Sequence, residues 1–193
     1  MTLTHPVADL PHQAGATILV TGSSDGIGKA TAKALARMGH RVLVHGRDPG
    51  RVGRAHEEVR KEATGPPPDA FTADLSTLHG VRGLSAAILD RYSRLDVLLK
   101  VAGVYMPERV VTPDGLEMTF AVNVVAPFLL ARLLMPLLEA SAPSRIVNVA
   151  SGAHFDAREV DWGNLQGERH YDGWGAYALS KLGAVLLTYA LAR

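Results

Sequence analysis

Residues 16–28 read ATILVTGSSDGIG, a short apolar run followed by a glycine-rich turn. The run 16–22 has the length of a buried strand, and 29–39 (KATAKALARMG) has helical spacing and a glycine stop. Between a strand and a helix, such a turn lets the backbone approach a pyrophosphate, which the free N–H groups of the helix N-terminus can bind. We therefore predict a dinucleotide-binding turn made of Gly22, Ser23, Ser24, Asp25, Gly26, Ile27 and Gly28.

The rest of the chain continues this alternation of strands and helices. Further strands are expected at 41–46, 69–75, 95–103 and 145–151, helices at 51–63, 77–92, 115–138 and 174–193, and a polar loop at 155–173. Such alternation predicts an α/β fold with a doubly wound, Rossmann-type parallel sheet that binds its nucleotide at the carboxyl ends of the strands. We expect one domain at 15–193 after a flexible tail at 1–14. Because a doubly wound sheet normally continues after such a last helix, we expect the last strands to be missing.

The composition excludes several kinds of site. A chain of 193 residues without cysteine forms no disulfide, thiolate zinc site or cysteine nucleophile, and it fits a reducing compartment, so we expect a cytoplasmic location. Lys and Arg number 20 and Asp and Glu 19, and the formal net charge of +1 gives no support for a nucleic-acid partner. No histidines and carboxylates stand at metal-ligand spacing, so no metal is expected.

Residues 121–138 form one long apolar stretch, AVNVVAPFLLARLLMPLL. Its length is borderline for crossing a membrane, and it is interrupted by Asn123, Pro127, Arg132 and Pro136. We interpret it as a buried interior helix and expect no membrane span. The first residues do not show the charged region and apolar stretch of a signal peptide.

The residues after the second strand bear on the choice of nucleotide. The strand ends His45-Gly46-Arg47-Asp48, and an arginine at this position can pair with the 2′-phosphate of NADP. An acidic residue would instead accept hydrogen bonds from the ribose 2′-hydroxyl of NAD. Arg47 stands first, so we expect NADP(H), with NAD(H) as the less favoured cofactor because Asp48 follows directly. The alternative is that Arg47 is a solvated turn residue.

Tyr177 and Lys181 stand four residues apart in YALSK, on one face of the last expected helix. An ammonium close to a phenol favours the ionised phenol, which suits a general acid or base. Ser151 ends the strand before this helix, where a hydroxyl can donate to a carbonyl oxygen as negative charge develops. This spacing often arises by chance on a solvated surface, but its place after the fifth strand favours a functional pair.

These motifs together resemble the short-chain dehydrogenase/reductase superfamily, in the branch of retinol dehydrogenases. The similar stretches, which follow one another in the same order and cover about residues 16–193, are TGSSDGIG, Asp74-Leu75, Ala102-Gly103, MTFAVNVVAPFLL, RIVNVASGAH and YALSK. The long interval at 152–173 between the serine and the tyrosine also resembles that branch.

The resemblance implies an oxidoreductase that moves hydride between nicotinamide and a small-molecule alcohol or carbonyl substrate. Tyr177 is then the general acid or base, Lys181 favours its ionisation and binds the nicotinamide ribose, and Ser151 polarises the carbonyl. Asn123 is expected to position a water that relays protons through Lys181; alternatively it bonds backbone at a helix irregularity.

The resemblance also implies contacts for the rest of the cofactor and a mode of assembly. Asp74 and Leu75 are expected to contact the adenine, and the backbone of Ala102 and Gly103 to line the adenosine side. A homodimer through the helices 115–138 and 174–193 is implied as well.

Two features depart from the family pattern. Lys100 and Val101 stand where the family usually has two asparagines that bond neighbouring strands, which predicts a loss of cofactor affinity or stability. The family also continues past Arg193 with a segment that contacts the nicotinamide and substrate, so we expect an incomplete substrate pocket.

Two other functions stay open at this point. One is an NADP-binding protein without turnover, which an incomplete substrate pocket would produce. The other is an α/β-hydrolase, because Gly22–Gly26 also fits the pattern G-x-S-x-G with Ser24 as nucleophile and His154 or His170 as its base. That elbow usually follows several strands rather than the first, and this favours the oxidoreductase.

Overall fold

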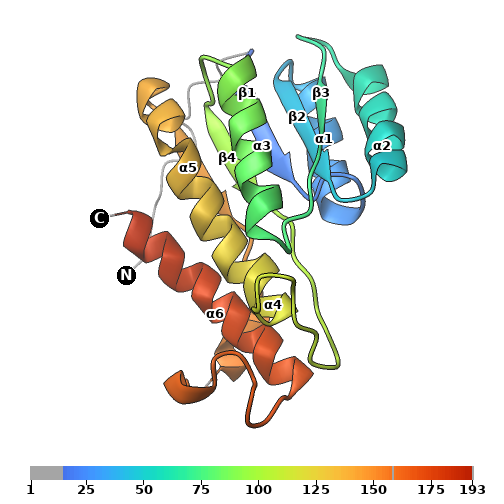
Figure 1. The fold of residues 1–193 in the computed structure, drawn as a ribbon. Helices are drawn as coiled ribbons and strands as arrows, with labels where there is room; N and C mark the ends of the chain where they lie inside the picture. The colour runs from blue at the N-terminus through green and yellow to red at the C-terminus, as the bar shows by residue number, and fades with distance from the viewer. Residues whose placement is uncertain (1–14, 158, 193) are drawn as a thin grey trace.

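The predicted doubly wound parallel sheet is confirmed by a computed structural model, which describes residues 15–157 and 159–192 (Figure 1). Five parallel strands lie in the order β3-β2-β1-β4-β5. They are β1 (Thr17–Thr21), β2 (Arg41–Gly46), β3 (Asp69–Thr72), β4 (Val97–Lys100) and β5 (Arg145–Asn148). The order reverses at β1, between β2 and β4, which is where this class of sheet opens a crevice for a ligand. The tail expected at 1–14 lies outside the described residues.

Helices connect the strands and carry the chain from one face of the sheet to the other. Their bounds are α1 (Gly26–Arg37), α2 (Pro49–Glu62), α3 (Leu78–Arg91), α4 (Met118–Phe120), the π-helical turn η2 (Ala121–Val125), α5 (Ala126–Ala140) and α6 (Gly173–Leu191). The segment expected to be a loop contains two short 3₁₀ turns, η3 (Gly152–Asp156) and η4 (Trp162–Asn164).

Three strands are shorter than predicted because their last residues leave the sheet. The predictions 69–75, 95–103 and 145–151 extend beyond β3, β4 and β5 at the carboxyl ends. There the chain turns into loops, as where the Asp74 side chain accepts a hydrogen bond from the Ser76 N–H at 2.9 Å. Hydrophobic runs continue through these ends, so the pattern alone overestimates the length of the strands.

The sheet is covered on both faces, and alternate strand residues serve the two layers. Leu19, Leu43 and Leu98 pack with α3 and α5, whereas Val20 and Val44 pack with α1 and α2. Both sets are buried, as the period of two in a parallel sheet with helices on each side requires. The buried strands hold the β1–α1 turn against the ends of its neighbours.

Side-chain caps fix where the helices begin. Asp48 accepts a hydrogen bond from the Arg51 N–H at 2.7 Å, Thr77 from Gly80 at 3.0 Å and Asp172 from Gly175 at 2.8 Å. Each cap satisfies an N–H group that the first helical turn leaves without a partner.

The long apolar helix is interrupted by a π-helical turn. The stretch Met118–Ala140 is long and apolar enough to cross a membrane by length and composition, with a window of mean hydropathy 1.9 that is 50% buried in the fold. A core helix passes the same test, and this one packs against α3 and β4 (Figure 1). The absence of a membrane span and the expected homodimer both stay predictions.

Lys100 places an ammonium inside the fold, beside α5. Its side chain is only 4% exposed, and Nζ donates to the carbonyl oxygen of Pro127 at 3.3 Å. Burial lowers the pKa of Lys100 from 10.5 to about 8, because the interior disfavours the charged form. We therefore expect the buried ammonium of Lys100, at a position that departs from the family pattern, to lower the stability of the fold.

We predict that this cost depends on pH. Below pH 8 the Lys100 ammonium is charged in both the folded and the unfolded state, and burying the charge carries its full free-energy cost. Between about pH 8 and 10.5 the unfolded chain keeps a proton that the folded protein has lost. The free energy of unfolding therefore rises with pH in this range. Lys100→Met should therefore be more stable than the parent at pH 7, by up to about 3 kcal/mol.

Urea unfolding of both proteins from pH 7 to 10.5 measures this difference, which should shrink towards zero at the upper end. A difference that does not change with pH would contradict the buried ammonium as its cause.

Candidate cofactor-binding and active site

A cavity of about 640 Å³ opens at the carboxyl ends of all five strands. It contains most of the predicted site residues, namely Gly22, Ser24, Asp25, Ile27, Gly28, Arg47, Asp74, Leu75, Ala102, Gly103, Ser151, Tyr177 and Lys181. Ser23, Gly26 and Asn123 do not line it. Segments far apart in the sequence thus meet at one crevice, as the strand order requires.

The glycine-rich turn is packed too closely for side chains at two positions. Gly22 has φ +68°, and a Cβ there would lie 2.7 Å from the Cα of Ala102. A Cβ on Gly28 would collide with the carbonyl oxygen of Gly22. The bare backbone therefore lies open to the cavity at the start of α1, and this cradle fits the pyrophosphate of a dinucleotide.

Hydrogen bonds of Ser23 and His45 connect the glycine turn to β2. The Ser23 hydroxyl donates to the carbonyl of Val20 at 2.7 Å and accepts from the His45 N–H at 2.8 Å. The Gly22 N–H donates to His45 Nδ1 at 3.2 Å, so Nε2 carries the proton and donates to the carbonyl of Ala73 at 3.2 Å. Burial lowers the pKa of His45 to about 4, which keeps the ring neutral in this bridge at neutral pH.

Sequence reasoning missed His45, which lines the cavity as part of its floor. A histidine at the end of a fully apolar strand, VLVH, is the signal that could have indicated a buried polar bridge. For Ser23 the geometry shows a buried side chain whose hydrogen bonds stay within the protein.

Arg47 and Asp48, the two residues that could select NADP or NAD, differ in the contacts of their side chains. Asp48 uses its carboxylate as the cap of α2. Arg47 is exposed and lines the cavity, and within residues 15–157 and 159–192 no hydrogen bond or ion pair engages its side chain. Asp74 and Leu75 line the same part of the cavity, beyond the end of β3.

Ser151, Tyr177 and Lys181 come together at the other end of the cavity. Lys181 is 6% exposed, with Nζ 3.3 Å from the carbonyl oxygen of Val149 and 5.5 Å from the centre of the Tyr177 ring. Burial lowers the pKa of Lys181. The Tyr177 ring packs between the side chains of Tyr105 and Trp174, with a centroid distance of 5.9 Å to each.

Asn123 holds the wall of the cavity through the π-helical turn. Its Oδ1 accepts the N–H of Val104 at 2.8 Å, and Nδ2 donates to the carbonyl of Val104 and to the Ser180 hydroxyl, both at 2.9 Å. This is the alternative foreseen for Asn123, a backbone bond at a helix irregularity, and it joins the loop after β4 to α6. Gly103 lies between Asn123 and Lys181, since a Cβ there would be 3.3 Å from Oδ1 and 3.5 Å from Nζ.

The side chain of Thr21 supports the neighbouring wall of the cavity, which is formed by the loop after β4. Thr21 Oγ1 accepts hydrogen bonds from the N–H groups of Val101 and Ala102, at 3.1 and 3.2 Å. These bonds hold the loop after β4 next to the glycine turn, although the Lys100 side chain turns away towards α5.

The arrangement does not assemble a hydrolase triad around Ser24. His154 packs on Phe155 and its Nδ1 lies 2.6 Å from the carbonyl oxygen of Ser151, while His170 lines a second cavity. In the part of the chain that the structure describes, no histidine bonds the Ser24 hydroxyl and no group of three metal-ligating side chains comes together.

Comparisons with known proteins agree with this geometry. The family model described as short chain dehydrogenase matches residues 16–193. A Streptomyces sp. (strain C5) protein provisionally named daunorubicin C-13 ketoreductase DnrU is 42% identical over 196 residues, 100% of this chain and 67% of that protein. Retinol dehydrogenase 13 of Homo sapiens is 41% identical over 180 residues, 93% of this chain and 54% of the enzyme.

A solved structure is similar to this chain in its fold. The RhlG/NADP active-site complex of Pseudomonas aeruginosa superposes with a TM-score of 0.72 and 29% identity, covering 93% of this chain and 67% of the other. The present chain spans between about half and two thirds of these proteins.

We predict opposite effects for alanine at two helical glycines. Gly28→Ala places a methyl against the backbone of Gly22 and should destabilise the protein by about 1–3 kcal/mol. Gly53→Ala, in an open position of α2, should stabilise it by about 0.5–1 kcal/mol. Denaturant unfolding of the two variants measures both effects, and equal effects would show that the close approach at Gly28 carries no constraint.

Proposed function

The chain belongs to the short-chain dehydrogenase family, and on that basis we propose that it is an NADP(H)-dependent oxidoreductase acting on an alcohol or carbonyl substrate. The observation that carries the proposal is that Ser151, Tyr177 and Lys181 line the same cavity as the glycine cradle. A cofactor whose pyrophosphate lies on that turn can extend towards the tyrosine.

The cofactor supplies the hydride chemistry, and the residues of the chain orient the substrate and move its proton. The Ser151 hydroxyl donates a hydrogen bond to the substrate oxygen, which stabilises negative charge as it develops there. The Tyr177 phenol gives its proton to that oxygen in reduction and removes it in oxidation.

Lys181 binds the nicotinamide ribose and places a positive charge beside the phenol. Its ammonium lies 5.5 Å from the Tyr177 ring and is largely shielded from water, so its charge acts on the phenol through a medium of low polarity. Asn123 positions this end of the site, because its amide holds Val104 and Ser180 in place around Gly103 and Lys181.

The preference for NADP(H) rests on Arg47. Its guanidinium reaches the cavity, while the Asp48 carboxylate is occupied as a helix cap and is a poor candidate for holding a ribose 2′-hydroxyl. The rings of Tyr105 and Trp174, each about half exposed beside Tyr177, favour an apolar substrate. The names of the relatives, a ketoreductase and a retinol dehydrogenase, fit that class.

A second candidate is a protein that binds NADP(H) without turnover. Fluorescence titration with NADPH and NADH, followed by a panel of aldehydes and ketones, separates the two functions. Binding with oxidation of NADPH supports the reductase, whereas binding without oxidation across the panel supports the second candidate.

We predict that Tyr177→Phe abolishes turnover and leaves NADPH affinity within about twofold of the parent, because it removes a proton donor and not a phosphate contact. Steady-state NADPH oxidation and fluorescence titration measure the two quantities on the same preparation. Tyr189→Phe removes a hydroxyl from an exposed position of the same helix and serves as the matched control. Retained turnover in Tyr177→Phe would exclude the assigned mechanism.

We predict that Arg47→Ala weakens NADPH binding by about tenfold, the size expected for one charge-assisted hydrogen bond. NADH affinity should stay unchanged, since that cofactor has no 2′-phosphate. Titration of both cofactors gives the ratio directly. If both affinities fall together, or neither does, Arg47 does not select the cofactor.

A further inference from the structure

The glycine turn carries a negative charge where a phosphate is expected. Asp25 lines the cavity, and its side chain is 64% exposed. Its Oδ1 accepts the Gly26 N–H at 2.8 Å, at the very start of α1. A carboxylate in this place repels a cofactor with several phosphates unless another group compensates its charge.

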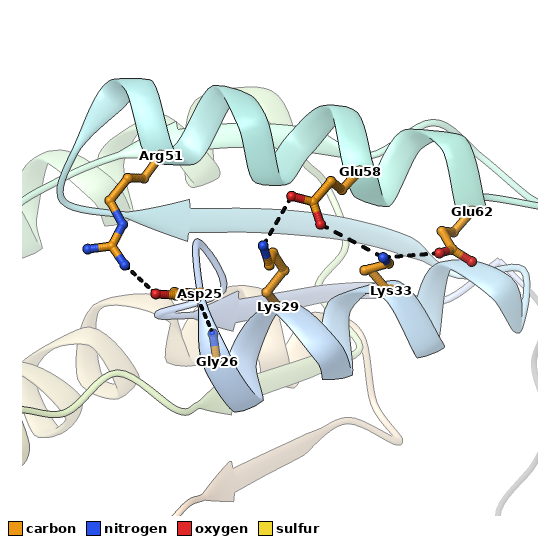
Figure 2. A network of polar contacts seen from close by, with 7 residues as sticks. All are labelled: Asp25, Gly26, Lys29, Lys33, Arg51, Glu58 and Glu62. Atoms are coloured by element: carbon orange, nitrogen blue, oxygen red, sulfur yellow. Dashed lines mark hydrogen bonds and ion pairs between the residues drawn. The ribbon is translucent and has the colours of Figure 1, made fainter.

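Arg51 is the group that compensates Asp25. Its guanidinium bonds the second carboxylate oxygen of Asp25 in an ion pair that bridges the glycine turn and the first turn of α2 (Figure 2). Asp48 fixes the origin of this side chain, because its cap bond holds the N–H of Arg51 at 2.7 Å. Arg51 stands four residues after Arg47, so both cations belong to the segment that leaves β2.

In this ion pair the acidic and basic residues come from the opposite helices to those in the neighbouring ion pairs between α1 and α2. Deeper between the two helices, the cations come from α1 and the carboxylates from α2. Lys29 pairs with Glu58 at 3.0 Å and Lys33 with Glu62 at 3.1 Å (Figure 2). Next to the cavity the acid lies on the α1 side and the arginine on α2. The reversed pair thus lies where the two helices adjoin the cavity, since Asp25 lines it.

The pair contributes little to holding the fold together. Both side chains are more than half exposed, and exposed ion pairs are weak contributors to stability. Its effect on a bound anion is different, because removing Arg51 alone would leave an unneutralised carboxylate on the cavity wall.

We propose that Arg51 is a positioning residue for cofactor selectivity, which neutralises Asp25 and thereby lets the turn accept NADPH. The inference rests on the proposed function. NADPH carries a further phosphate compared with NADH, and Arg47, its proposed partner, lies on the same β2–α2 segment as Arg51. An uncompensated Asp25 therefore costs NADPH more affinity than NADH.

A double-mutant cycle on the whole chain tests this coupling. The four proteins are the parent, Asp25→Asn, Arg51→Ala and the double variant; asparagine keeps an oxygen that can cap α1. Fluorescence titrations give the affinities for NADPH and NADH. We expect Arg51→Ala to weaken NADPH binding by about fivefold and NADH by less than about twofold at low salt.

In the Asp25→Asn background, the same Arg51→Ala change should alter NADPH affinity by less than about twofold. The loss caused by Arg51→Ala alone should shrink in about 1 M salt, which screens exposed charges. Arg51→Lys should keep the parent affinity. Arg54→Ala removes an equal charge from the same helix and should have no effect, since Arg54 forms no ion pair within residues 15–157 and 159–192.

Several results would overturn the inference. An equal loss of NADPH affinity in both backgrounds would mean that Arg51 touches the phosphate itself. An unchanged ratio of the two affinities in Arg51→Ala, with a parent protein that binds NADPH, would overturn the inference and leave the proposed function standing. A parent protein that binds neither cofactor would overturn both.

Discussion

The close approach of backbone segments at Gly22 is the constraint on which the rest of the site depends. No side chain fits between this residue and Ala102, and none fits on Gly28 against the carbonyl of Gly22. The β1–α1 turn therefore lies directly against the loop after β4, where the strand order reverses. The start of α1 faces the cavity as a result, so that its free N–H groups can bind an anion.

Polar side chains in the interior keep this close approach in register. Ser23 and a neutral His45 join the turn to β2 and to the loop after β3, and Thr21 joins it to the loop after β4. Asn123 continues the same support towards α6. Each of these groups is buried and hydrogen-bonded, which is the condition under which polar groups can specify one arrangement of a core.

Charged side chains lie both in the interior of the fold and at the cavity, and they differ in their partners. Lys100 lies in the interior and donates to the carbonyl oxygen of Pro127, whereas Arg47 is exposed at the cavity. Asp25 and Arg51 place opposite charges at the glycine-rich turn. Near the glycine turn the cavity thus holds the exposed guanidinium of Arg47 and the ion-paired carboxylate of Asp25, and at its other end the shielded ammonium of Lys181 beside Tyr177.

The sequence by itself determined the order of strands and helices, the place of the glycine turn and the spacing of Tyr177 and Lys181, because all of these are local patterns of period or composition. It overestimated the lengths of β3, β4 and β5, since apolar runs continue after the ladder of hydrogen bonds has ended. Only the tertiary structure decided which groups the side chains of His45, Asn123, Lys100 and Arg51 contact. Their partners are brought close by the folded chain, as in the 80-residue separation between Thr21 and Val101, and such distant pairings leave no mark in a local pattern.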